Sequence, residues 1–177
     1  MADKEGRTAL MLAASEGQTE VMKILLKQGG IRYDTDNYGR VALLYAANAG
    51  EAEAVKLLLE HSLLPDFADK YGLTALFYAT IEDEVEIAHI LLKQGAMPDF
   101  ANKEGETALM WAAKAGYNDI AKLLIEAGAN VNALSHKGNT ALMYAREKGH
   151  EEMVDILLKA GALEEQKQEK ESPTPQE

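Results

Sequence analysis

Four histidines are the side chains in this chain best suited to bind a metal or to move a proton near neutral pH. A zinc site on one helix needs two of them three or four residues apart, as in a His-Glu-x-x-His motif. Here no two histidines have that spacing, and there is no cysteine to serve as a metal ligand or a thiol nucleophile. The sequence therefore predicts no metal site. The histidines are His61, His89, His136 and His150.

Other kinds of chemistry also lack a signature. The acidic run from Glu82 to Glu86 has no alternating oxygen ligands around a glycine turn, which a calcium loop requires, so we interpret it as a solvated turn. No glycine-rich phosphate loop is present, because the glycines are spaced apart and stand at the ends of predicted helices. A catalytic triad assembled from distant segments stays open in principle, but no residues point to one. We predict no catalytic residue and no cofactor.

Composition narrows the class of partner. The chain has 177 residues, 47% of them hydrophobic, and a formal net charge of −11. An acidic chain repels the phosphates of nucleic acids, so nucleic-acid binding is disfavoured and a basic protein partner is favoured. The longest apolar run, 41–47, is far too short to cross a bilayer. The charged first residues lack a secretory core, and we expect a cytoplasmic, monomeric protein without membrane contact.

The glycines reveal a repeat. One column recurs every 33 residues without an insertion, and thirteen of the fourteen glycines fall in three such columns. Asp83 and Ser62 stand where the second and third columns lack a glycine. The first column consists of Gly6, Gly39, Gly72, Gly105 and Gly138.

Apolar residues keep the same period, with an Ala-Leu pair, an alanine four residues after that Ala and a final aliphatic triplet in each unit. The units are expected at 3–35, 36–68, 69–101, 102–134 and 135–163, and are called the first to fifth units below. The segment 164–177 is rich in Glu, Gln and Lys and has little apolar surface to bury, so we expect a disordered acidic tail.

Each unit is predicted to contain a helix, a tight turn, a second helix and an extended finger. Threonine precedes the first helix in four units and suits an N-cap, whereas Val41 cannot cap the second unit. One unit cannot bury its own apolar face, so stacking on its neighbours is what makes it stable. The expected caps are Thr8, Thr74, Thr107 and Thr140.

These units resemble the ankyrin repeat, whose pattern runs roughly D-x-x-G-x-T-P-L-H-x-A-A-x-x-G-H, followed by a leucine pair and G-A-x-x-N. The fourth unit shows this in Gly105, Thr107-Ala108-Leu109, Ala112-Ala113, Leu123-Leu124 and Gly128-Ala129-Asn130. The resemblance extends over residues 3–163 and implies an all-α solenoid of stacked helix-turn-helix units with β-turn fingers. Where the family often has His, this chain has an apolar residue, so apolar packing should replace the hydrogen bonds of that His. This column is Met11, Leu44, Phe77, Met110 and Met143.

The resemblance also implies where a partner binds, because proteins of this kind use the face formed by the finger tips and first helices. Exposed aromatics grouped on a rigid face are typical binding anchors, and Tyr38 and Tyr71 lie on adjacent units. The alternative is that these tyrosines only cover the base of the finger. The predicted contact residues are Tyr38, Arg40, Tyr71, Leu73, Ile81, Glu104, Trp111 and Lys114.

A second aromatic column lies on the first helices, and we interpret it mainly as packing between units, with polar tips reaching the groove. Trp111 is expected to be partly accessible. The column consists of Leu12, Tyr45, Tyr78, Trp111 and Tyr144.

Three functions remain open at this point. The favoured one is a non-catalytic adaptor or inhibitor that binds a protein or peptide. The second is a recognition or regulatory part of a larger enzyme, channel or secreted effector. The third is an enzyme on an unusual scaffold. Fold alone does not decide between them.

Overall fold

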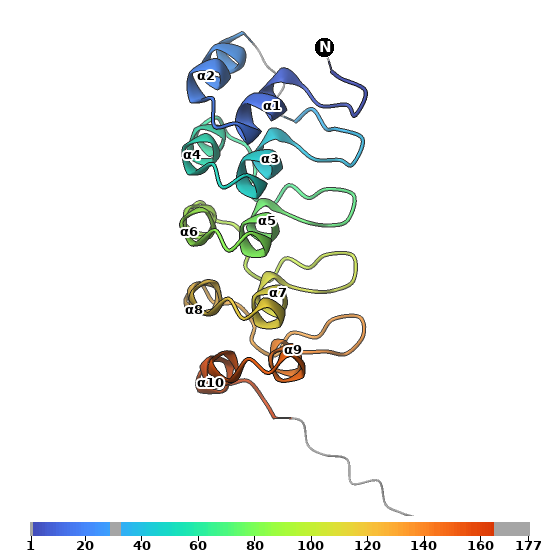
Figure 1. The fold of residues 1–177 in the computed structure, drawn as a ribbon, viewed down its shortest axis with the longest axis vertical. Helices are drawn as coiled ribbons and strands as arrows, with labels where there is room; N and C mark the ends of the chain where they lie inside the picture. Colours follow the sequence, from blue (N-terminus) through green and yellow to red (C-terminus); the bar gives the residue numbers. More distant parts are fainter. Residues whose placement is uncertain (1, 29–32, 165–177) are drawn as a thin grey trace, which may run out of the picture.

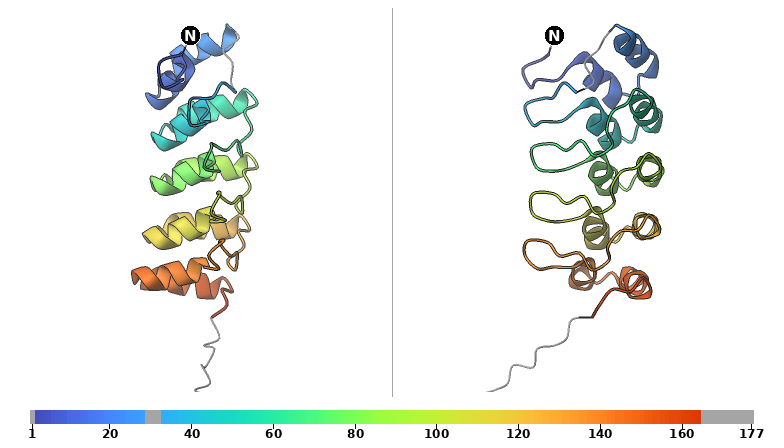
Figure 2. Two further views of the ribbon diagram at one scale, coloured as in Figure 1. Left: turned by 90° about the vertical axis from the view of Figure 1, so that its right-hand side faces the viewer. Right: turned by 180° about the vertical axis from the view of Figure 1, so that it is seen from behind.

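The computed structural model describes residues 2–28 and 33–164, and these contain ten α-helices arranged as five stacked pairs (Figure 1). A finger loop precedes the first helix of each pair, and the fingers all project to the same side of the stack (Figures 1 and 2). The expected tail lies outside the described residues apart from Glu164. The helices are α1 (Ala9–Ser15), α2 (Thr19–Lys27), α3 (Ala42–Asn48), α4 (Ala52–Glu60), α5 (Ala75–Ile81), α6 (Val85–Lys93), α7 (Ala108–Ala115), α8 (Asn118–Glu126), α9 (Ala141–Lys148) and α10 (Glu151–Lys159).

The helices form two layers. The first helices of the pairs stack on one another beside the fingers, and the second helices stack in a column on the side away from the fingers (Figure 1). The first helices are α1, α3, α5, α7 and α9. All helix pairs with extensive contacts belong to the same unit or to adjacent units. The molecule is an elongated all-α solenoid, as predicted.

Small side chains let the first helices approach one another closely. Ala46, Ala79, Ala112 and Ala145 are completely buried. Four of the five apolar residues in the expected histidine column are also buried, with Phe77 and Met110 each 1% exposed, whereas Met143 in the last unit is half-buried. The rings of Phe77 and of Trp111 in the next unit form a T-shaped pair with a centroid distance of 6.5 Å. Apolar packing therefore links the units at this column, as expected.

The caps of the first helices follow the sequence with one exception. The hydroxyls of Thr8, Thr107 and Thr140 accept hydrogen bonds from the third amide of their helices, and Val41 provides no such bond. The prediction for Thr74 was wrong, because its hydroxyl makes no cap bond and is buried without a hydrogen-bond partner. The backbone of Thr74 is extended like that of the other caps, so the difference is confined to its side chain.

The two non-glycine substitutions in the glycine columns keep the backbone conformation of the residues they replace. Ser62 and Asp83 have φ angles of 67° and 57°, in the left-handed region that glycine adopts most easily. The turns are therefore preserved at these two positions, at a cost in backbone strain.

Candidate functional site

The finger loops are shaped by one polar side chain at their base. Asp36 Oδ1 accepts hydrogen bonds from the backbone N–H groups of Tyr38 and Arg40, both at 2.8 Å. Asp69 Oδ1 does the same for Tyr71 and Leu73, at 2.8 and 2.9 Å. The two tyrosines therefore lie on loops whose backbone is fixed from within.

Successive fingers are also bonded to one another. In each finger after the first, a backbone N–H at the tip donates to a carbonyl of the preceding finger, so the fingers form a regular row (Figure 2). The carbonyls of Tyr38 and Tyr71 are both acceptors in this row, which holds these residues at a constant spacing. The four bonds are Asn37 to Glu5 at 3.0 Å, Lys70 to Tyr38 at 2.9 Å, Lys103 to Tyr71 at 3.0 Å and His136 to Glu104 at 2.9 Å.

The aromatic column on the first helices binds the finger bases. Tyr45 and Tyr78 donate their hydroxyls to the carboxylates of Asp36 and Asp69, at 2.7 and 2.9 Å. These residues pack between units, and their polar tips are held by carboxylates at the edge of the groove. Leu12, in the first unit, is exposed instead.

One carboxylate in this network was not recognised from the sequence. Glu106 accepts the indole N–H of Trp111 on one oxygen and the hydroxyl of Tyr144 on the other, both at 2.9 Å. Tyr144 belongs to the next unit, so Glu106 ties two units together. A carboxylate five residues before the tryptophan was the signal in the sequence.

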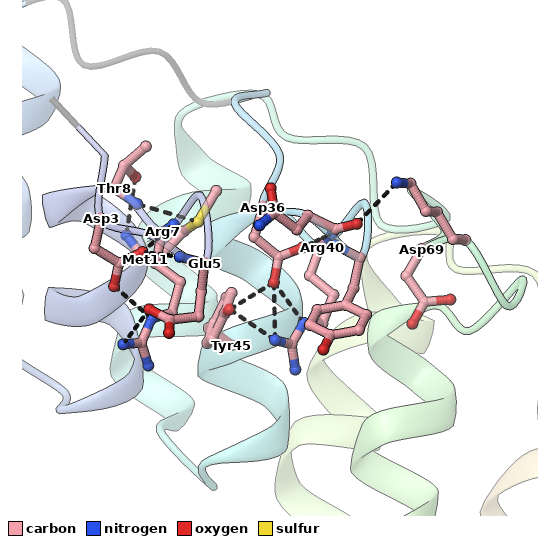
Figure 3. Close-up of polar contacts among 12 residues, drawn as sticks. Asp3, Glu5, Arg7, Thr8, Met11, Asp36, Arg40, Tyr45 and Asp69 are labelled. Atoms are coloured by element: carbon pink, nitrogen blue, oxygen red, sulfur yellow. Dashed lines mark hydrogen bonds and ion pairs between the residues drawn. The ribbon is translucent and has the colours of Figure 1, made fainter.

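Arg40 is engaged within the protein (Figure 3). Its guanidinium donates from Nε to Asp36 Oδ2 at 2.8 Å and from Nη2 to the Tyr45 hydroxyl at 2.9 Å. Its Cζ lies 5.1 Å from the centre of the Tyr38 ring and 4.6 Å from that of Tyr45, within the range of cation–π attraction. Arg40 therefore supports Tyr38 as well as lining the surface.

The ionisation of this cluster follows from its contacts. Burial by itself raises the pKa of Asp36, but hydrogen bonds from the Arg40 backbone, the Tyr45 hydroxyl, the Arg40 guanidinium and the Tyr38 backbone outweigh it, so the pKa lies below its usual value. Burial and the bond to Asp36 raise the pKa of Tyr45 to about 12. At neutral pH the carboxylate is charged and the phenol is neutral.

We expect Asp36→Asn to lower the free energy of unfolding at pH 7 by roughly 1–2 kcal/mol, because a charged acceptor is lost while the loop-forming oxygen remains. Since folding lowers the pKa of Asp36, its contribution is complete above the usual value of 3.8 and disappears as the pH falls through the folded-state pKa. Urea unfolding at pH 7 and near pH 3 measures this. The gap between the two proteins should shrink in acid, and a constant gap would contradict the assignment.

Tyr38, Arg40 and Tyr71 line one pocket of about 220 Å³, together with Asp69 and Tyr78. The two tyrosines at its rim are 48% and 55% exposed. The pocket spans the second and third units, so it exists only because the units are stacked.

Ile81, Trp111 and Lys114 line a second, more apolar pocket of about 310 Å³ at the ends of α5 and α7. Lys114 Nζ lies 5.6 Å from the centre of the Trp111 ring. The two remaining predicted contact residues line neither pocket: Leu73 is half-buried, and Glu104 is exposed at the tip of the fourth finger. The predicted surface thus contains two separate pockets.

The histidines have different surroundings. His150 Nε2 lies 3.2 Å from the carbonyl oxygen of Lys114, and His61 Nδ1 lies 2.8 Å from that of Leu57. Within 2–28 and 33–164, no group of three or more His, Asp or Glu side chains is placed to hold a metal ion. No helix in the same part of the chain has the length and hydropathy to cross a membrane.

Comparison with known proteins gives one result. A family model described as ankyrin repeats (3 copies) matches residues 1–63, 32–102 and 95–169, which together cover most of the chain. No curated protein matches the chain.

Proposed function

The chain belongs to the ankyrin-repeat family, and on this premise we propose that it is a non-catalytic adaptor or inhibitor that binds a segment of a partner protein along the finger tips and first helices. Ankyrin repeats are in general protein–protein interaction modules. The observation that carries the proposal is the pair of exposed tyrosines, Tyr38 and Tyr71, on adjacent fingers with fixed backbones.

Rigidity is what makes this pair suitable for binding. Large aromatic side chains bury much area on binding and lose little conformational entropy when their backbone is already fixed. The backbone at Tyr38 and Tyr71 is held by an aspartate within each loop and by the bond to the next finger. A partner segment that lies across the fingers would contact both rings and then reach the second pocket beside Trp111 and Lys114.

We also propose that this protein is monomeric and cytoplasmic and that its partner is basic. A net charge of −11 favours encounter with basic proteins and opposes self-association.

The double variant Tyr38→Ala/Tyr71→Ala tests the proposal. We expect its affinity for a partner obtained by affinity capture and then purified to fall by about 2 kcal/mol, because two anchors are removed. Calorimetric titration measures the affinity, and circular dichroism should show an unchanged helical spectrum.

Tyr33→Ala is the matched control, since Tyr33 is also 43% exposed but donates its hydroxyl to the carbonyl of Ser62, away from the finger tips. This variant should bind the partner like the parent protein. Equal affinities of the double variant and the parent would refute the assignment of the two tyrosines as anchors.

A further inference from the structure

The second and third units share a polar constellation but differ in one residue. Each has an aspartate at the finger base, a tyrosine at the tip and a tyrosine on the first helix that donates to the aspartate. The second unit completes this set with Arg40, whereas the third has Leu73 at the same position. The corresponding residues are Asp36 and Asp69, Tyr38 and Tyr71, and Tyr45 and Tyr78.

The second unit shows how a guanidinium fits this constellation (Figure 3). Arg40 lies over the rings of Tyr38 and Tyr45 and is bonded to the Asp36 carboxylate and to the Tyr45 hydroxyl. Asp36 is 4% exposed. The negative charge of its buried carboxylate is compensated by Arg40, a cation from the same unit.

The third unit has the same carboxylate and tyrosines but no cation of its own, although Arg40 of the second unit also lines the pocket beside Asp69 and interacts with Tyr78. Asp69 is 7% exposed, and its carboxylate accepts two backbone N–H groups and the Tyr78 hydroxyl. No Lys or Arg among the described residues forms an ion pair with it. Leu73 does not line the pocket of about 220 Å³ that Asp69 shares with Tyr71 and Tyr78.

We infer that this pocket receives an arginine side chain of the partner segment, which would stack on Tyr71 and pair with Asp69 as Arg40 does with Asp36. The inference rests on the proposed function and specifies the chemistry of the partner. An apolar side chain would remove water from a buried carboxylate without replacing its hydrogen bonds, which is unfavourable. A planar guanidinium can stack on a ring while its edge donates several hydrogen bonds, whereas a lysine ammonium is a compact charge with no plane to stack. The positive charge of Arg40 at the rim is already neutralised by Asp36.

The test uses the full chain and a defined probe, Nα-acetyl-arginine N-methylamide, with the citrulline and lysine analogues as comparisons. Citrulline has nearly the shape of arginine but no charge. We expect saturable chemical-shift changes at the backbone amides of Tyr71 and Leu73 in NMR titrations, with a dissociation constant in roughly the millimolar range for a single side chain. The citrulline and lysine probes should bind more weakly.

Two variants and a matched control locate the site. Asp69→Asn should weaken binding of the arginine probe by about tenfold or more, and Asn102 shows that an asparagine holds the same loop, because its Oδ1 accepts the Glu104 and Glu106 amides at 2.9 and 2.8 Å. Leu73→Arg gives the third unit a cation at the position that Arg40 has in the second, so the new guanidinium should pair with Asp69 and abolish probe binding. Asp155→Asn makes the same change at an exposed residue of α10 and should leave binding unchanged.

The inference is upheld if the arginine probe binds at these amides and loses affinity in both pocket variants but not in the control. It is overturned if no saturable change occurs, if citrulline binds as well as arginine, or if Asp69→Asn has no effect. If removal of Tyr38 and Tyr71 abolishes partner binding but the arginine probe gives no response, the proposed binding surface is supported and the arginine site is rejected.

Discussion

Phe77→Ala is expected to lower the free energy of unfolding by about 3–5 kcal/mol, the range found when a buried phenylalanine is truncated. Phe77 is 1% exposed and contacts Trp111 of the next unit. The third unit has neighbours on both sides, so the structure can collapse only partly into the cavity. Because whole domains are stable by only about 5–15 kcal/mol, this change should be visible as a large shift of the urea midpoint followed by circular dichroism.

Leu64→Ala is a suitable comparison, since Leu64 is 63% exposed and its loss should cost less than about 0.5 kcal/mol. If Phe77→Ala were no more costly than Leu64→Ala, the apolar column would not be the contact that joins the units.

Gly105→Ala is expected to cost roughly 2–3 kcal/mol. Gly105 has a φ angle of +72°, and a Cβ atom there would lie 2.6 Å from His136 Cδ2 and 2.8 Å from the His136 backbone nitrogen. Left-handed backbone at a residue with a side chain costs about 1–2 kcal/mol by itself. The clash adds to this, because the same nitrogen donates to the Glu104 carbonyl in the row of fingers.

Gly138→Ala separates the two contributions. Gly138 occupies the same place in the last finger and has a φ angle of +77°, but nothing lies within 4 Å of its added Cβ. It should therefore show the backbone strain alone, and the difference between the two variants in urea unfolding measures the contact between the fourth and fifth fingers. Equal losses would mean that this contact contributes nothing to stability.

Most of the fold follows from the sequence because its signals recur five times. The glycine and alanine columns predicted paired helices with close-packed first helices, and the structure and the family match confirm both the solenoid and the family. Thr74 shows the limit of such reasoning. Its residue type and position predicted a cap, but whether a hydroxyl reaches the amide depends on side-chain placement, which the pattern does not contain.

The candidate site was predictable only in its outline. The sequence placed Tyr38 and Tyr71 on neighbouring fingers, but it did not show that Arg40 is held by Asp36 and Tyr45. It also gave no sign of the Asp69 pocket, because that pocket combines side chains of two units and depends on how closely they stack. Contacts between units are the part that a single unit's pattern leaves undetermined.

Extensive helix contacts of the described residues are restricted to the same or adjacent units. This restriction affects the order in which the units unfold. Because these contacts do not reach beyond adjacent units, we expect the end units of the stack to unfold before the central ones. Amide hydrogens of the terminal helices α2 and α10 should then exchange faster than those of α5 and α6. A ligand bound across the second and third fingers would hold these two units together, and it should slow amide exchange most in the N-terminal half.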